Sequence, residues 1–215
     1  MGLHFLHCPC ILLQIIDRKT GKFIMDFTKL SPARRTIRRF EQRIVPDEEL
    51  RHLIDMARFA SCGSNKQFLR YIVIRQPEAV KAVFETTRWA GLVAPRRTPV
   101  WGVDAPLCFI AVTMPVDAEN AIRHADAGAA IQTIQLAAWE RGLGCCWFAS
   151  FDPAKVAEIT GLAAGYKVLY LIAAGYPAES PVSETAVDGN VDYYLDAEDV
   201  LHIPKLPVDE ITEWM

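Results

Sequence analysis

The sequence has little of what membrane-bound, secreted or nucleic-acid-binding proteins require. Its apolar stretch at residues 11–16 is interrupted by Gln14 and is much shorter than the roughly 20 residues of a membrane-spanning helix. No cationic segment precedes this stretch and no small-residue cleavage site follows it, which makes a secretory signal a poor fit. The formal net charge of -3 favours neither nucleic acid nor an anionic membrane surface. We therefore expect a cytoplasmic protein that binds neither.

Cysteine pairs with the spacing of zinc ligands are also absent. The six cysteines form no two C-x-x-C arms, and Cys145 and Cys146 are direct neighbours. We expect no metal site and interpret the cysteines as reduced thiols, with the vicinal pair acting as small buried side chains. Cys8 and Cys10 leave a redox or metal pair open, although two ligands alone do not make a site.

The chain is long enough for one sizeable core and too short for two ordinary domains. It has 215 residues, of which 51% are hydrophobic. Residues 1–24 differ in texture from the rest, and Met25-Asp26-Phe27 resembles a natural start. We therefore divide the chain into an N-terminal extension of doubtful status, residues 1–24, and a domain at 25–215. The extension is interpreted either as a dispensable arm or as an overlong start assignment.

Hydrophobic patterning predicts helices and strands in alternation. Helices are expected at residues 46–60, 78–88 and 121–141, followed by a short one that Asp152 and Pro153 begin, and strands at 71–74, 107–112, 145–149 and 168–174. The continuous apolar run at 107–112 predicts a strand covered on both faces in the middle of a sheet. This order favours a mixed sheet with helices on its faces. After residue 177 the turn-rich sequence predicts a tail laid over a surface or a partner.

Residues 34–39 gather four arginines and Thr36 near the start of this core. Arginine side chains match phosphate oxygens with paired hydrogen bonds, and a threonine hydroxyl adds a directional donor. If the segment is extended, alternation puts Arg34, Thr36 and Arg38 on one side, where they can converge on a single dianion. By itself such a run is also typical of a solvated basic face. Nucleic-acid binding through the same arginines conflicts with the net acidity of the chain.

Two further segments suit a flat ligand with polar edges. Residues 61–67 combine small residues, the flexible Gly63 and the amides of Asn65 and Gln67, which both donate and accept hydrogen bonds. The glycines that open residues 142–152 let the backbone approach a planar ligand, and the N–H groups further along can face a developing anion. Each pattern alone is equally typical of an ordinary loop.

Taken in this order, with Gly175-Tyr176-Pro177 behind them, the segments resemble those of the nitroreductase family of FMN-dependent oxidoreductases. The resemblance runs from about Asp26 to the C-terminus. Residues 34–38 are similar to the phosphate-binding opening of the family, with Thr36 in place of the usual serine. Residues 61–67 are similar to the loop beside the isoalloxazine ring, although Phe68 stands where a proline is usual. The most specific part is Asp126-Ala127-Gly128 followed by Gly142-Leu143-Gly144 and Cys146-Trp147.

The resemblance implies an α+β fold, an α/β sandwich whose central sheet is mixed, largely antiparallel and flanked by helices. It also implies an obligate homodimer with FMN between the subunits. Lys205 stands where the family often presents a lysine and an arginine to the phosphate, and Trp89, Ala90 and Gly91 belong to a variable segment that shapes the acceptor pocket. The FMN contacts implied are Arg34, Arg35, Thr36, Arg38, Ser61, Cys62, Gly63, Asn65, Gln67, Cys146, Trp147, Ala149, Ser150 and Lys205.

The activity implied is electron transfer from NADH or NADPH, through FMN, to a nitroaromatic, a quinone or a similar acceptor by a ping-pong mechanism. The cofactor supplies the chemistry, so no side chain is expected to act as a general base. Ala149 and Ser150 would face the reactive edge of the flavin through their backbone. Other reactions of the family are dehalogenation, flavin destruction and ring dehydrogenation. A flavin-binding module that stores FMN or senses redox state is the alternative outside enzymes, and fold alone does not choose among these.

Overall fold

A computed structural model describes residues 15–16, 23–24 and 26–215. The first two of these pieces form β1 (Ile15–Ile16) and β2 (Phe23–Ile24), which pair antiparallel. The thiols of Cys8 and Cys10, and most of the predicted N-terminal extension, lie outside the described residues. Within the described part, no helix is long and apolar enough to cross a membrane.

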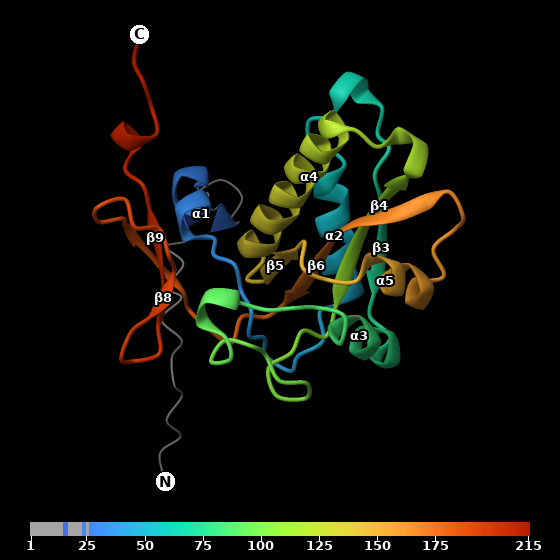
Figure 1. The fold of residues 1–215 in the computed structure, drawn as a ribbon, viewed down its shortest axis with the longest axis horizontal. Helices are drawn as coiled ribbons and strands as arrows, with labels where there is room; N and C mark the ends of the chain where they lie inside the picture. The colour runs from blue at the N-terminus through green and yellow to red at the C-terminus, as the bar shows by residue number, and fades with distance from the viewer. Residues whose placement is uncertain (1–14, 17–22, 25) are drawn as a thin grey trace.

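A four-stranded antiparallel sheet forms the centre of the fold (Figure 1). Its strand order is β3 (Arg70–Ile74), β4 (Phe109–Pro115), β6 (Tyr166–Gly175) and β5 (Gly144–Phe148). The prediction that the apolar run after residue 107 lies mid-sheet is confirmed, since β4 pairs with β3 on one side and β6 on the other. Every residue from Phe109 to Met114 is buried, because helices cover both faces of this strand.

Helices α2 (Asp47–Ala57) and α4 (Ala121–Glu140) pack on one face of the sheet, and α3 (Pro77–Phe84) and α5 (Pro153–Thr160) on the other. Successive strand residues therefore serve different cores. Ile110 and Val112 contact the side of α2 and α4, while Phe109 and Ala111 contact the side of α3 and α5. The predicted helices on both faces are confirmed. The central sheet, predicted to be mixed and largely antiparallel, is antiparallel at every pairing of its four described strands.

The helix ends follow from local chemistry. The side chain of Asn120 accepts a hydrogen bond from the backbone of Arg123 at the start of α4, and Asp152 does the same for Lys155 at the start of α5, as its sequence predicts. The short helix α1 (Phe27–Ala33) was not expected from the sequence. It buries only Leu30 and contains Pro32, so it has no apolar periodicity to reveal it.

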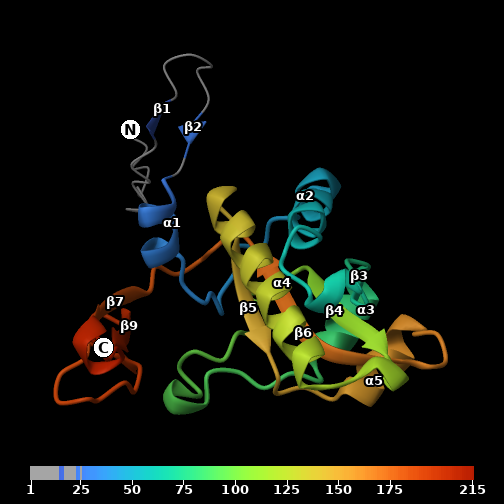
Figure 2. The same ribbon diagram turned by 90° about the horizontal axis from the view of Figure 1, so that it is seen from above.

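The tail contains more structure than its sequence predicts. Strands β7 (Val182–Thr185), β8 (Tyr194–Leu195) and β9 (Leu201–Lys205) form a second sheet in the order β7-β9-β8, with β7 and β9 parallel. Figure 2 shows this tail sheet to one side of the four-stranded sheet. Short 3-10 turns complete the fold at η1 (Gly63–Asn65), η2 (Gly91–Val93), η3 (Val116–Ala118) and η4 (Val208–Glu210).

Candidate functional site

Residues 34–38 run extended alongside the start of β5. The backbone N–H of Ile37 donates to the carbonyl of Cys145 at 3.0 Å, and Thr36 forms a parallel bridge with the same cysteine. Arg35 and Ile37 are buried, whereas Arg34, Thr36 and Arg38 are half-buried. The alternation expected for an extended segment is therefore present, with Arg34, Thr36 and Arg38 on the more open side.

The segment lies this close to β5 because Gly144 has no side chain. A Cβ atom added at Gly144 would come within 2.4 Å of the Cγ1 atom of Ile37, well inside any real contact distance. Gly144 is thus a packing requirement of this strand, in keeping with the close backbone approach expected for residues 142–152.

Arg34 and Arg35 are short of negative partners. Neither has a carboxylate within 4.0 Å among the described residues, and Nε of Arg34 is buried without a hydrogen-bond partner. Arg35 donates to the carbonyl of Arg34 at 2.6 Å and to Oγ of Ser183 in β7 at 2.7 Å. Burial lowers the pKa of both guanidinium groups. Unpaired, partly desolvated positive charge of this kind suits an anionic ligand.

Arg38 and Arg39 have different surroundings although they are neighbours. The guanidinium of Arg38 lies 5.2 Å from the ring centroid of Tyr193 and has no carboxylate within ion-pair distance in the described part of the chain. Arg39 is committed to the fold, since it pairs with Asp104 at 3.2 Å and with Asp199 at 3.6 Å. Arg38 is therefore the member of this pair that is available to a ligand.

A buried carboxylate accepts hydrogen bonds from the backbone at the end of the arginine segment, residues 34–38. Glu179, whose side chain is 3% exposed, accepts hydrogen bonds from the backbone N–H groups of Arg38 at 2.5 Å and Arg39 at 3.3 Å. Arg97 lies 3.7 Å from its other oxygen. Sequence reasoning missed Glu179 and Arg97, because nothing local links them to residues so far away along the chain.

The loop at residues 61–67 adopts an uncommon backbone. Ser64, Asn65 and Gln67 all have positive φ, at 53°, 52° and 51°. Nε2 of Gln67 donates to Oδ1 of Asn65 at 3.1 Å. Positive φ is uncommon at serine and glutamine, although asparagine tolerates it, and such conformations cluster at active sites and ligand-binding loops. Ser61, Cys62 and Gln67 also line a cavity of about 990 Å³ between α2 and β3, to which residues 34–38 do not contribute.

The end of β5 presents backbone and one aromatic ring. Cys146 is buried, and burial raises the pKa of its thiol to about 12, which fits a filler and not a redox thiol. Trp147 is 39% exposed and meets the ring of Tyr170 edge-on at 5.2 Å. Ala149 and Ser150 are exposed.

The remaining predicted contacts are more scattered. Trp89 lies in the core of this chain, 7% exposed and edge-on to Phe148 at 4.4 Å, while Ala90 and Gly91 lie nearer the surface at the start of η2. Lys205 is exposed at the end of β9 and has no carboxylate within 4.0 Å among the described residues. Whether these residues contact cofactor or acceptor stays a prediction.

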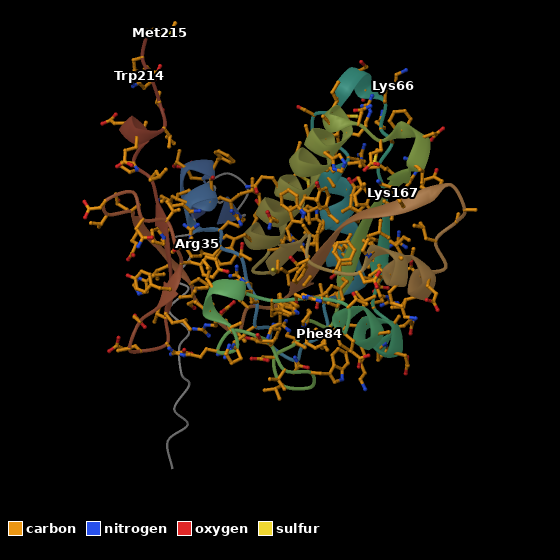
Figure 3. All side chains as sticks on the ribbon, in the orientation of Figure 1. Arg35, Lys66, Phe84, Lys167, Trp214 and Met215 are labelled. Atoms are coloured by element: carbon orange, nitrogen blue, oxygen red, sulfur yellow. The ribbon has the colours of Figure 1, made fainter. Side chains whose placement is uncertain are left out.

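The arginine segment, residues 34–38, and the amide loop, residues 61–67, lie near opposite ends of α4. Gly63 contacts Arg123 and Asp126 in the first turns of this helix, whereas Ile37 contacts Gly144 just beyond its last turn. A helix of 20 residues is about 30 Å long. Figure 3 shows the separation through the labelled Arg35 and Lys66. Within one chain, the two predicted halves of the site are apart.

Comparisons with known proteins agree with one another. The family model described as "Nitroreductase family" matches residues 32–176 of the chain. An NADH dehydrogenase of Thermus thermophilus is 27% identical over 194 residues, covering 73% of this chain and 89% of that protein. A Desulfovibrio desulfuricans protein solved in complex with FMN is 27% identical, with a TM-score of 0.62, over 75% of this chain and 91% of that one. An FMN-dependent nitroreductase of Clostridium difficile, 21% identical, shares the fold with a TM-score of 0.61 over 77% of this chain and 94% of its own.

Proposed function

Because the chain belongs to the nitroreductase family, we propose that it is an FMN-dependent oxidoreductase that passes electrons from NADH or NADPH to a small acceptor such as a nitroaromatic or a quinone. The observation that carries the proposal is the pair of arginines, Arg34 and Arg35, that lack a carboxylate partner in the described structure. The relative from Desulfovibrio desulfuricans, solved with FMN, supports the choice of ligand.

The residues present fit a flavin nucleotide. A buried Nε without a partner on Arg34, next to the hydroxyl of Thr36 and the uncommitted guanidinium of Arg38, suits a terminal phosphate dianion. The amides of Asn65 and Gln67 suit the ring edges, which carry carbonyl oxygens beside ring nitrogens. Ala149 and Ser150 are exposed residues, and their backbone N–H groups suit the reactive edge. Lys205 adds a positive charge that has no carboxylate partner among the described residues.

We propose further that each site is shared between two copies of the chain. The phosphate-binding residues and the amide loop lie near opposite ends of α4, so a single chain does not bring them around one nucleotide. A two-fold dimer in which α4 lies at the interface would place the amide loop of one subunit beside the arginine segment of the other. Ala127, Ala130 and Ala137 of α4 are buried in the core of their own chain, so the half-buried residues of the helix, such as Ala129 and Leu136, would make this contact.

The chemistry is divided between cofactor and protein. When bound, FMN would supply the redox chemistry, a ping-pong transfer of electrons from NAD(P)H to the acceptor. Arg34, Thr36 and Arg38 would hold the phosphate, Asn65 and Gln67 would hydrogen-bond to the edges of the ring, and the backbone of Ala149 and Ser150 would face its reactive edge. The buried thiols of Cys145 and Cys146 take no part, because burial raises the pKa of both groups.

The first test measures the cofactor and turnover together. The purified full-length protein is expected to show a flavin absorbance band that denaturation releases as FMN, and to oxidise NADH or NADPH when a quinone is supplied. A colourless protein that does not take up added FMN at micromolar concentration would refute the proposal. A protein that retains FMN but oxidises neither nicotinamide would be a flavin-binding module instead of an enzyme.

A complementation experiment tests the shared site. One chain carries Arg34→Glu, and a second chain with a different tag carries Asn65→Ala with Gln67→Ala. In a mixed dimer, one site would receive both defects and the other neither, so the purified mixed dimer should bind about half the FMN of the wild-type dimer. If each site belongs to one chain, every site in the mixed dimer is damaged and no such recovery appears.

A further inference from the structure

Gly63, in the amide loop, is held at both of its backbone polar groups by the beginning of α4. Nη1 of Arg123 donates to the carbonyl of Gly63 at 2.9 Å, and the N–H of Gly63 donates to Oδ1 of Asp126 at 2.8 Å. Arg123 and Asp126 also pair with each other at 2.7 Å across one turn of the helix. Two side chains of α4 thus form hydrogen bonds to both backbone polar groups of a single loop residue.

The contacts of Arg123 and Asp126 with Gly63 are shielded from water. The side chains of Arg123 and Asp126 are 12% and 9% exposed. Burial by itself raises the pKa of Asp126, but hydrogen bonds from the N–H of Gly63 and from the side chains of Arg123 and Cys62 outweigh it, so the pKa of this carboxyl is lowered. Asp126 therefore stays ionised at neutral pH, and its hydrogen bonds are of the strong, charge-assisted kind.

Packing fixes the same point of the loop. A Cβ atom added at Gly63 would come within 2.7 Å of Cγ2 of Ile122 and 3.2 Å of Nη1 of Arg123. The guanidinium carbon of Arg123 also lies 4.8 Å from the ring centroid of Phe68, at the far end of the loop. Arg123 therefore contacts the loop at both of its ends, at Gly63 and at Phe68.

The residues between these two anchors are the strained ones. Ser64, Asn65 and Gln67 have positive φ, and none is a glycine. Such conformations persist only where the surrounding structure over-determines them. Local hydrogen bonds supply part of that constraint, such as those from the N–H of Asn65 to the carbonyl of Cys62 at 3.0 Å and from Arg70 to the carbonyl of Gln67 at 2.8 Å. The contacts at Gly63 and Phe68 supply the part that ties the loop to α4.

We propose that Arg123 and Asp126 are positioning residues for the flavin: from α4, they hold residues 63–68 in the strained form that presents Asn65 and Gln67 to the ring. The inference rests on the proposed function, because the loop is assigned to FMN there. Neither residue needs to touch the cofactor. In Figure 3 the label of Lys66 marks where this loop lies, at the end of α4 away from Arg35.

The test compares variants of the Arg123–Asp126 contact with a control ion pair that joins α2 to the C-terminal end of α4. Asp126→Ala removes the acceptor and the charge, whereas Asp126→Asn keeps an acceptor for the N–H of Gly63. Glu49→Gln is the control, since Glu49 pairs with Arg141 at 2.8 Å near the other end of α4 and does not contact the loop. Each protein is stripped of cofactor, and the dissociation constant for FMN, the visible circular dichroism of bound FMN and the thermal unfolding of the apoprotein are measured.

Asp126→Ala is expected to weaken FMN binding at least about tenfold, equal to ~1.4 kcal/mol, and to change the visible circular dichroism. Asp126→Asn should recover part of both, and Glu49→Gln should change neither. Phe68→Leu provides a milder variant in case Asp126→Ala does not fold, with an expected two- to fivefold weakening, about 0.4–1 kcal/mol, and the same change in dichroism.

The possible failures are distinguishable. If the wild-type protein takes up no FMN, the proposed function is wrong. If the wild-type protein binds FMN but the Asp126 and Phe68 variants match it in both dissociation constant and dichroism, the positioning role alone is overturned. A fall in the apoprotein melting temperature with unchanged dichroism and affinity would likewise overturn it, because it would leave only a structural role.

Discussion

Replacing Arg34 by methionine is expected to change two properties in opposite directions: the apoprotein becomes more stable and FMN binding becomes weaker. The reason is that Arg34 is half-buried, that its Nε has no hydrogen-bond partner, and that no carboxylate lies within ion-pair distance in the described part of the chain. Desolvation by burial disfavours the charged form of this guanidinium and so lowers its pKa. Only a bound anion would offset that cost.

The magnitudes follow from the same contacts. An unsatisfied buried donor costs about 1–3 kcal/mol, and because only one nitrogen of Arg34 is orphaned we take the lower end, about 1 kcal/mol. For a chain of this size that corresponds to a rise of about 2–4 °C in the melting temperature of the apoprotein. Hydrogen bonds to a charged group contribute roughly 1.5–3 kcal/mol, so the dissociation constant for FMN should rise about 10- to 150-fold.

Differential scanning calorimetry of the stripped protein and fluorescence titration with FMN measure the two effects. Arg39→Met is the matched control, because Arg39 is paired with Asp104 and Asp199. It should lower the melting temperature and leave the affinity for FMN nearly unchanged. The reasoning is refuted if Arg34→Met destabilises the apoprotein and binds FMN as well as the wild type does.

Two further predictions concern the elements that support the site. In the tail sheet, His202 lies between Glu184 at 2.8 Å and Asp196 at 3.0 Å, hydrogen bonds that raise its pKa above the usual 6.5. The stabilisation that protonated His202 gives the tail sheet is therefore complete below about pH 6.5 and is lost as the pH rises through the folded-state pKa of His202. Amide hydrogen exchange in β9 should accelerate with pH more steeply in the wild type than in His202→Gln. Parallel pH profiles for the two proteins would contradict this prediction. Gly144→Ala should cost about 1–3 kcal/mol in unfolding free energy and weaken FMN binding, because its Cβ would lie 2.4 Å from Cγ1 of Ile37. The double variant with Ile37→Ala should regain part of the FMN affinity. A double variant that binds FMN no better than Gly144→Ala would count against this packing argument.

The central fold was predictable because its elements carry strong local patterns. The strand β4 is apolar at every buried position, and α4 has a wide small-residue face that ends at Gly142. The tail sheet was missed because its strands are short and only partly buried. The pairing of Val182 with His202 also joins residues that are distant in the sequence.

The candidate site was predictable as a set of segments but not as a geometry. Composition singled out the arginines at 34–39, yet the sequence does not tell the uncommitted Arg38 from Arg39, whose partner Asp104 is far along the chain. Asp126 was noticed only as part of a motif. Its hydrogen bond to Gly63 depends on how the loop folds back onto α4, which no local pattern specifies.

If the two parts of each FMN site come from the ends of α4 in different subunits, this arrangement also determines which mutations are recessive and which are dominant. If the dimer is as proposed, a cell that makes normal chains together with chains damaged in the arginine segment would keep one working centre in every mixed assembly, so the lesion would behave as recessive. A proline introduced at Gly128 would instead bend α4, which separates the two half-sites, because it removes a hydrogen bond inside this helix. The two ends of one α4 contribute to different FMN sites in the proposed dimer. One bent helix would therefore damage both sites of a mixed dimer, and this mutation would be dominant.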